Sequence, residues 1–197
     1  MKAGSLKLRK GDALLIVDVQ NDFLPGGALG IAGGDAIVPV LNGYGEKFDH
    51  CALPVLASRD WHPPDHCSFQ AQGGPWPPHC VAGTHGAELS SHLALPRHSD
   101  IISKARESDR DAYSALDGTG LAARLRQLHV GRLFVGGLAT DYCVRATVLD
   151  ALAAGFEVVV LEDAIRAVDA RPGDGERAVA EMVAHGARRA RLEQVHV

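Results

Sequence analysis

Residues 136–147 read Gly-Gly-Leu-Ala-Thr-Asp-Tyr-Cys-Val-Arg-Ala-Thr, and this stretch decides the predicted fold. It follows an apolar run, 131–135, which predicts a buried strand. It continues into 144–154, where apolar residues recur at helical spacing before Gly155 ends the pattern. We therefore expect Cys143 to lie where a strand turns into a helix.

A cysteine in this position has two interpretations. Free backbone N–H groups and the positive end of the helix dipole stabilise an anion, so we expect Cys143 to have a lowered pKa and a nucleophilic thiolate. The same N–H groups can hold the oxyanion that forms when a thiolate attacks a carbonyl carbon. The alternative is a buried, inert cysteine. Position alone leaves both open, because a nucleophile needs partner groups.

Strands and helices alternate along the rest of the chain. Strands are expected at 13–17, 54–58, 100–103, 131–135, 156–161 and 190–195. Helices are expected at 35–48, 116–128, 144–154 and 174–185. This alternation predicts an α/β fold of three layers, in which helices cover both faces of a doubly wound, mostly parallel six-stranded sheet. No Gly-x-Gly-x-x-Gly motif follows the first strand, which argues against dinucleotide binding.

Composition narrows the class of protein. A chain of 197 residues, of which 46% are hydrophobic, fits a single domain spanning 1–197. The formal net charge of −4, with dispersed Lys and Arg, argues against nucleic-acid binding. The apolar runs are too short to cross a membrane. Four cysteines are too few for a disulfide scaffold, so we expect free thiols and a cytoplasmic location.

Three reactive residues are expected at one edge of the sheet. Asp18, Lys104 and Cys143 each follow a predicted strand, and ligands bind at the carboxyl ends of strands in open α/β sheets. Asp18 could take the thiol proton and later deliver it to a leaving amine. Lys104 could keep Asp18 ionised and stabilise the thiolate. An ordinary solvated lysine remains the alternative for Lys104.

A long irregular segment, 60–84, carries a second group of candidate residues. Asp60 and His62 are two residues apart and share one side of an extended chain, and His79 is a third potential ligand. One carboxylate and two imidazoles leave positions open for water or substrate, as in catalytic metal sites. His66 is either a fourth ligand or a residue that supports the ligands. The donor set suits zinc, iron and manganese alike, with zinc preferred.

Four segments carry a family resemblance: 16–23, 59–66, 76–84 and 137–144. With Lys104 and the following 111–115, they resemble the nicotinamidase/pyrazinamidase branch of the isochorismatase-like cysteine hydrolases. The matches occur in family order from about residue 12 to residue 167. Two small departures are Tyr142, where some relatives have histidine, and the spacing from Asp60 to His66.

The resemblance implies a role for each matched residue. It implies a triad of Asp18, Lys104 and Cys143, and one divalent metal ion held by Asp60, His62 and His79. It implies an oxyanion hole formed by the amides of Ala139 and Cys143, with a cis peptide before Ala139. It also implies a pocket for a flat ring, with apolar and aromatic walls formed by Phe23, Leu29, Trp76 and Tyr113.

The expected function is the hydrolysis of nicotinamide to nicotinate and ammonia in NAD salvage, with pyrazinamide as a further substrate. Two alternatives remain, an amidase for another small amide and a catalytically silent metabolite-binding scaffold. Relatives that act on other amides lack the metal loop, and a silent scaffold does not need an intact triad. The sequence leaves the oligomeric state open, including a homo-oligomer.

Overall fold

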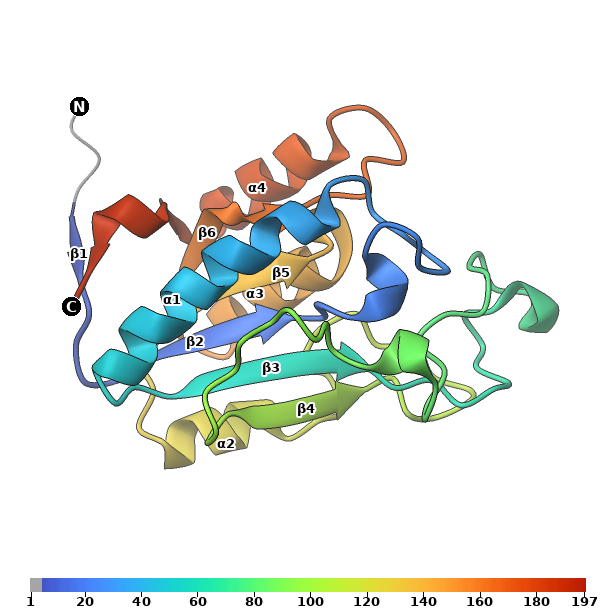
Figure 1. Cartoon of the computed structure of the whole chain (residues 1–197), viewed down its shortest axis with the longest axis horizontal. Helices are drawn as coiled ribbons and strands as arrows, with labels where there is room; N and C mark the ends of the chain where they lie inside the picture. Colours follow the sequence, from blue (N-terminus) through green and yellow to red (C-terminus); the bar gives the residue numbers. More distant parts are fainter. Residues whose placement is uncertain (1–4) are drawn as a thin grey trace.

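A parallel sheet of six strands forms the centre of the computed structural model, which describes residues 5–197 (Figure 1). Its strands lie in the order β4-β3-β2-β5-β6-β7, and every neighbouring pair is parallel. They are β2 (Asp12–Val17), β3 (Val55–Asp60), β4 (Asp100–Lys104), β5 (Arg132–Leu138), β6 (Glu157–Arg166) and β7 (Arg188–Ala190). The predicted doubly wound α/β architecture is confirmed.

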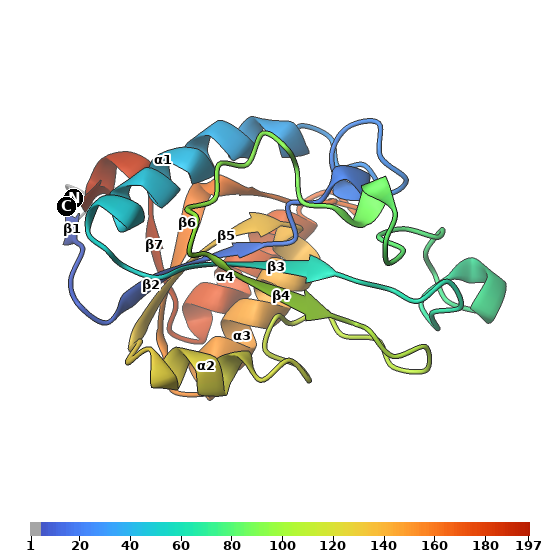
Figure 2. The same ribbon diagram turned by 60° about the horizontal axis from the view of Figure 1, so that its bottom comes forward.

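Helices cover both faces of this sheet (Figure 2). Helix α1 (Val38–His50) packs on one face, and α2 (Leu121–Gln127), α3 (Arg145–Ala153) and α4 (Asp174–Ala184) pack on the other. Alternate residues of the central strand β2 serve the two layers, because Leu14 lies in the core with α1 whereas Leu15 lies in the core with the other helices. Burial on both faces explains why β2 reads as a continuous apolar run.

The predicted helix at 116–128 is wrong at its start, since α2 begins only at Leu121. Gly118 and Gly120 adopt φ of 68° and 75°, which the helical conformation does not allow. The Leu121 amide, at this new start, donates a hydrogen bond to the Thr119 hydroxyl at 3.2 Å. The spacing of apolar residues in the sequence did not indicate this turn.

The predicted last strand at 190–195 is divided between two structures. Strand β7 ends at Ala190, a 3-10 turn occupies Leu192–Gln194, and β8 (Val195–His196) pairs with β1 (Leu6–Lys7) as a separate ribbon. The ammonium of Lys47 on α1 donates to the carbonyls of Leu192 and Val195 at 2.8 and 2.6 Å, which ties this segment to α1.

The strand order brings four strand ends to one edge. Strand β2 is central, with β3 and β4 on one side and β5 on the other. In register, Asp60 of β3 lies opposite Lys104 of β4, and Val17 of β2 lies opposite Gly137 of β5. Ligands bind at such an edge, where the chain continues to opposite sides of the central strand. None of the helices within residues 5–197 has the length and apolar character needed to cross a membrane.

Candidate active site

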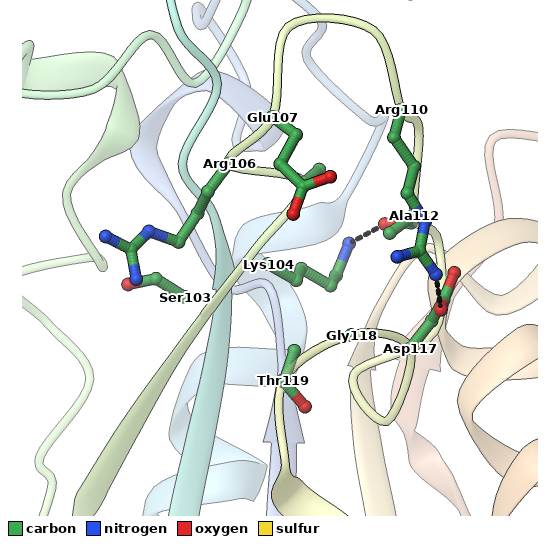
Figure 3. Close-up of a pocket in the computed structure, with 10 residues that line it drawn as sticks. Ser103, Lys104, Arg106, Glu107, Arg110, Ala112, Asp117, Gly118 and Thr119 are labelled. Atoms are coloured by element: carbon green, nitrogen blue, oxygen red, sulfur yellow. Dashed lines mark hydrogen bonds and ion pairs between the residues drawn. The ribbon is translucent and has the colours of Figure 1, made fainter.

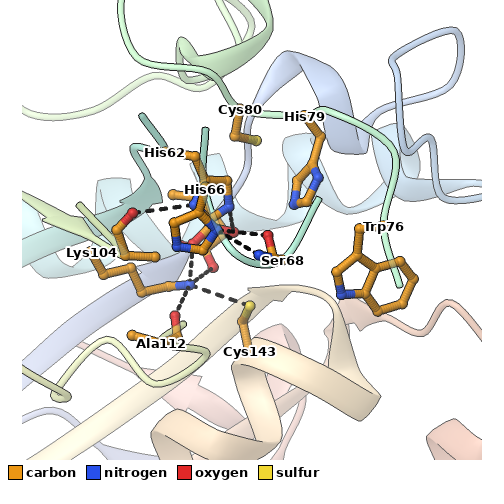
Figure 4. Close-up of polar contacts among 12 residues, drawn as sticks. His62, His66, Ser68, Trp76, His79, Cys80, Lys104, Ala112 and Cys143 are labelled. Carbon is orange, nitrogen blue, oxygen red and sulfur yellow. Dashed lines mark hydrogen bonds and ion pairs between the residues drawn. The ribbon is translucent and has the colours of Figure 1, made fainter. Parts of the chain in front are cut away.

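One buried ammonium lies at the centre of the candidate site (Figure 4). Lys104 Nζ is 3.0 Å from Asp18 Oδ2, 2.5 Å from Asp60 Oδ1 and 3.4 Å from Cys143 Sγ. It also donates to the carbonyl of Ala112 at 3.1 Å. Asp18 and Cys143 thus meet at the third expected residue, Lys104, which is buried rather than solvated.

Asp18 is held at the end of β2 by its neighbours on β3. Its amide donates to the carbonyl of Ser58 at 3.1 Å, and the Ser58 hydroxyl donates to Asp18 Oδ1 at 2.7 Å. The backbone of Asp18 has φ 50°, which turns the chain sharply after the strand. Within residues 5–197, Asp18 Oδ2 accepts no hydrogen bond, although it lies close to Lys104. This oxygen is therefore free to receive a proton.

Cys143 lies in a π-helical turn, Thr140–Val144, that joins β5 to α3. The carbonyl of Ala139 accepts hydrogen bonds from Tyr142 and Val144, both at 3.1 Å. The bond between Leu138 and Ala139 is cis. The amides of Ala139 and Cys143, the expected oxyanion hole, thus belong to the turn that carries the thiol.

Burial and charge together set the pKa of each charged group in the cluster. Burial alone would lower the pKa of Lys104, but Asp18 and Asp60 outweigh it, so the pKa lies well above its usual value and the ammonium stays charged. Burial raises the pKa of Asp18 more than Lys104 lowers it. At Asp60 the balance is reversed, because Lys104 and His62 outweigh burial and the pKa falls.

The expectation of a lowered pKa at Cys143 is wrong for this chain. Burial raises the pKa of the thiol well above its usual value, and the charges of Asp18 and Asp60 raise it further. Lys104 acts in the opposite direction but does not outweigh them. An argument from the helix start alone missed carboxylates that two other strands bring to the sulfur. Cys143 is therefore protonated at rest, with Asp18 beside it as an acceptor.

Three ligand atoms converge beside this cluster. Asp60, His62 and His79 each offer one atom, and these atoms all lie within 4.8 Å of one another. The Nδ1–H of His62 donates to the carbonyl of Ala105 at 3.2 Å, and that of His79 donates to the carbonyl of Pro77 at 2.8 Å. Because a carbonyl can only accept, both rings keep an Nε2 lone pair for a metal.

Burial also keeps one of these rings uncharged. It lowers the pKa of His62 to about 4, so the ring is neutral at neutral pH, the form that binds metals. Asp60 Oδ2 lies 3.8 Å from His62 Nε2, on the side of the carboxylate away from Lys104. One carboxylate and two imidazoles fit a divalent metal ion.

His66 does not join this set. Its ring stacks on His62 with centroids 4.1 Å apart, yet both of its nitrogens have protein partners. Nε2 donates to the carbonyl of Arg110 at 3.1 Å, and Nδ1 lies 2.7 Å from the Ser68 hydroxyl. With both nitrogens engaged, His66 supports the loop and has no lone pair free for a metal.

A small apolar pocket opens onto both groups of residues. Its free volume is about 40 Å³. The Trp76 Nε1–H donates to the Tyr113 hydroxyl at 3.0 Å across its walls. All four expected wall residues line it, together with three that the sequence did not single out; the lining residues are Phe23, Leu29, Ile31, Asp60, Trp76, His79, Tyr113, Ala139, Tyr142, Cys143 and Val168.

A larger polar cleft of about 340 Å³ lies on the other side of Lys104 (Figure 3). It is lined by the arginines Arg106 and Arg110, and Arg110 is paired with Asp117 on its rim. Cys143 and the three ligand residues do not line it. The smaller apolar pocket is therefore where the reactive groups meet.

Sequence comparison relates this arrangement to known proteins. A family model described as the isochorismatase domain matches residues 12–194. The nicotinamidase of Acinetobacter baylyi is 39% identical over 93% of this chain and 94% of that protein. The crystal structure of the pyrazinamidase of Pyrococcus horikoshii in complex with zinc is 49% identical, with a TM-score of 0.88 over 92% of this chain and 99% of that one. A structure from L. infantum in complex with nicotinate is 37% identical, with a TM-score of 0.91 over 98% and 99%.

Proposed function

The chain belongs to the isochorismatase family, and we propose that it hydrolyses nicotinamide to nicotinate and ammonia. One observation carries the proposal: the thiol of Cys143 and two of the three metal-ligand residues, Asp60 and His79, line the same apolar pocket. A flat pyridine ring between Phe23 and Trp76 has the thiol near its carboxamide and the ligand atoms near its ring nitrogen.

The first half of the reaction forms a thioester. Asp18 Oδ2 takes the proton from Cys143 Sγ, and the sulfur forms a bond to the carboxamide carbon. The carbonyl oxygen takes up the displaced electron pair and is held by the amides of Ala139 and Cys143. Lys104 stays protonated and stabilises the negative charge on the sulfur before attack. The C–N bond then breaks as Asp18 returns its proton to the nitrogen, which leaves as ammonia.

The second half hydrolyses the thioester. Asp18, again a carboxylate, takes a proton from water, and the oxygen adds to the acyl carbon. The C–S bond breaks, the proton on Asp18 returns to the Cys143 sulfur, and the product acid loses its proton to solvent and leaves as nicotinate. One carboxylate thus takes up and returns a proton in each half of the reaction. Its raised pKa suits this alternation, because an acid–base catalyst works best when its pKa lies near the working pH.

The metal is proposed to be zinc, held by Asp60, His62 and His79. The zinc complex of the Pyrococcus horikoshii relative and the donor set of one carboxylate and two imidazoles support this choice. When bound, the ion would act as a Lewis acid toward a pyridine nitrogen and so orient the ring. Pyrazinamide keeps both the carboxamide and such a nitrogen, and it is proposed as a second substrate.

The cellular setting is proposed from the cysteines. Cys51, Cys67, Cys80 and Cys143 are all free, which suits a reducing compartment and a cytoplasmic enzyme. Residues 1–197 are proposed to form one domain, since the family model covers most of the chain.

An ammonia-release assay with three carboxamides tests the function. Nicotinamide and pyrazinamide should both be hydrolysed, whereas benzamide, a ring of the same shape without a nitrogen, should have a kcat/KM lower by roughly 100-fold or more. Treatment with a chelator should abolish turnover, and zinc should restore it. Equal rates for benzamide and nicotinamide would contradict the proposed role of the metal, and no turnover of nicotinamide by zinc-loaded enzyme would contradict the function.

A further inference from the structure

We propose that Gln20 and Asp22, which follow Asp18 in one loop, are positioning residues of the metal site: Gln20 fixes the Asp60 ligand, and Asp22 fixes the chain that carries His79. This inference rests on the proposed metal-dependent function. The hydrogen bonds of both side chains go to backbone groups, so both residues would act through the backbone.

The side chain of Gln20 binds both the amide and the carbonyl of Asp60. Its Nε2 donates to the carbonyl of Asp60 at 2.8 Å, and its Oε1 accepts from the Asp60 amide at 2.8 Å. The same Nε2 donates to the carbonyl of Ala87 at 2.9 Å. The side chain is fully buried, and these three bonds satisfy both of its polar atoms.

The position of Asp60 in the sheet explains why this contact is needed. Asp60 is the last residue of β3, and Lys104 of β4 pairs with it on one side. On the other side β2 has already ended at Val17, and its pairing with β3 reaches only Ala57. The carboxamide of Gln20 therefore replaces the backbone amide that a longer β2 would present. Without it, the ligand would lie at a strand end held on one side only.

Asp22 performs the equivalent task for His79. Its Oδ2 accepts from the Cys80 amide at 2.7 Å, directly after the ligand. Cys80 has φ 47°, so the chain turns at this point. The carboxylate fits only against a glycine, because a Cβ on Gly86 would overlap Asp22 Oδ2. An alanine at position 86 would displace the carboxylate without changing Asp22 itself.

The residue between them provides a matched control. Asn21 points elsewhere, and its side-chain amide donates to the carbonyl of His85 at 2.8 Å on an exposed surface. Three alternate residues of this loop thus have separate partners: Asp18 contacts Lys104, Gln20 binds the backbone of Asp60, and Asp22 binds the chain next to His79. Asn21 has a hydrogen bond to none of these groups. A general loosening of the loop would affect all of these variants, whereas a positioning role would not affect Asn21→Ala.

The test measures zinc affinity by competition with a chromophoric chelator. Gln20→Met keeps the length of the side chain without its hydrogen bonds, Asp22→Asn replaces one acceptor oxygen by a donor, and Gly86→Ala displaces the carboxylate. Each should weaken zinc binding by roughly 10–100-fold, the usual loss when a group that orients a metal ligand is removed. Asn21→Ala should stay within about twofold of the unmodified protein.

Two further readouts separate positioning from stability. The absorption spectrum of the cobalt-loaded protein should change in Gln20→Met and Asp22→Asn, because the ligand geometry changes. The rise in Tm on adding zinc should shrink, since ligand-linked stabilisation follows affinity. A lower Tm of the metal-free protein, with zinc affinity and the cobalt spectrum unchanged, would overturn the inference.

The same experiment keeps this inference distinct from the proposed function. If the unmodified protein binds zinc and hydrolyses nicotinamide while all three variants bind zinc equally well, only the positioning role fails. If the unmodified protein binds no zinc, the proposed metal dependence itself fails, and the positioning role fails with it.

Discussion

The two halves of the site are built by different means. Lys104 is the last residue of β4, and Asp18 and Cys143 follow β2 and β5, so a buried sheet sets where all three lie. His62 and His79 lie in an irregular segment after β3, where side-chain bonds to carbonyls and a short pairing of His62 with Val81 hold the chain. A sheet fixes groups rigidly but buries their charge, whereas a loop holds ligands through many replaceable bonds. We therefore expect catalysis by the triad to be lost when a single reactive group is changed. Metal binding by the loop should also depend on the residues that position its ligands.

The strongest test removes the nucleophile alone. Cys143→Ala should lower kcat by roughly 10⁴-fold or more, because no other thiol lines the pocket to form the thioester. Zinc affinity should not change, since the ligands belong to the other half of the site. Ammonia release and zinc titration measure the two effects separately.

Cys51→Ala is the matched control, a free cysteine outside the site. It should keep full turnover. Substantial residual activity in Cys143→Ala, or an acyl adduct on another cysteine, would refute the assignment of the nucleophile.

A second test separates thiol reactivity from catalysis. Asp18 raises the pKa of Cys143 through its negative charge. Asp18→Asn removes this charge, so the pKa should fall and the thiolate fraction at a given pH should rise. Iodoacetamide should then modify Cys143 of the metal-free protein faster, while kcat falls by roughly 10²–10⁴-fold for want of an acid–base catalyst.

Peptide mass spectrometry gives the alkylation rate, with Cys51 as an internal reference. Slower alkylation of Cys143 in Asp18→Asn would mean that the carboxylate favours the thiolate at rest, so that Asp18 lowers the pKa of Cys143 instead of raising it.

The difference between the halves also explains what the sequence could predict. Apolar runs locate strands, and residues just after them must meet at one edge of a parallel sheet, so Asp18, Lys104 and Cys143 could be placed together. The roles of Gln20 and Asp22 could not be recognised, because their partners are backbone groups of Asp60 and Cys80, distant in sequence. Residue spacing and the resemblance both indicated ligands in the segment 60–84, and neither indicated the residues that support them.

Two other features depended on three-dimensional surroundings. The choice between ligand and support for His66 required the carbonyl of Arg110, 44 residues away in sequence. The pKa of Cys143 required burial and two carboxylates from other strands. The position of these residues in the sequence predicted where their side chains lie, but it did not predict the hydrogen bonds of His66 or the pKa of Cys143.

A third test concerns the cost of buried charge in the sheet half. Lys104→Met leaves Asp18 and Asp60 without their cation, and breaking a buried ion pair in this way costs about 3–5 kcal/mol of stability. Both carboxylates would then have folded pKa values above their unfolded values. A carboxylate of this kind does not destabilise the folded state at a pH below its unfolded pKa, and it destabilises that state increasingly as the pH rises. The Tm of metal-free Lys104→Met should therefore increase from pH 8 to pH 5 relative to the unmodified protein.

Lys47→Met is the control, because Lys47 donates two hydrogen bonds to carbonyls and, within residues 5–197, pairs with no carboxylate. It should lower the Tm by a similar amount at both pH values. A loss of stability in Lys104→Met that does not depend on pH would show that the two carboxylates do not rely on Lys104.

The smallest effect is expected where the two halves meet over the pocket. Trp76 belongs to the loop and Tyr113 follows β4, and the hydrogen bond between them spans the walls. Tyr113→Phe keeps the ring and removes only this bond, whose net worth is about 0.5–1.5 kcal/mol. KM for nicotinamide should rise by less than about tenfold, with kcat unchanged because neither side chain belongs to the triad that carries the proton transfers and the thioester. Tyr142→Phe is the matched control, since the Tyr142 hydroxyl makes no hydrogen bond within residues 5–197, and it should leave KM unchanged. If Tyr113→Phe lowered kcat instead, Tyr113 would act on the reacting atoms, and the loop and the sheet would not be separable.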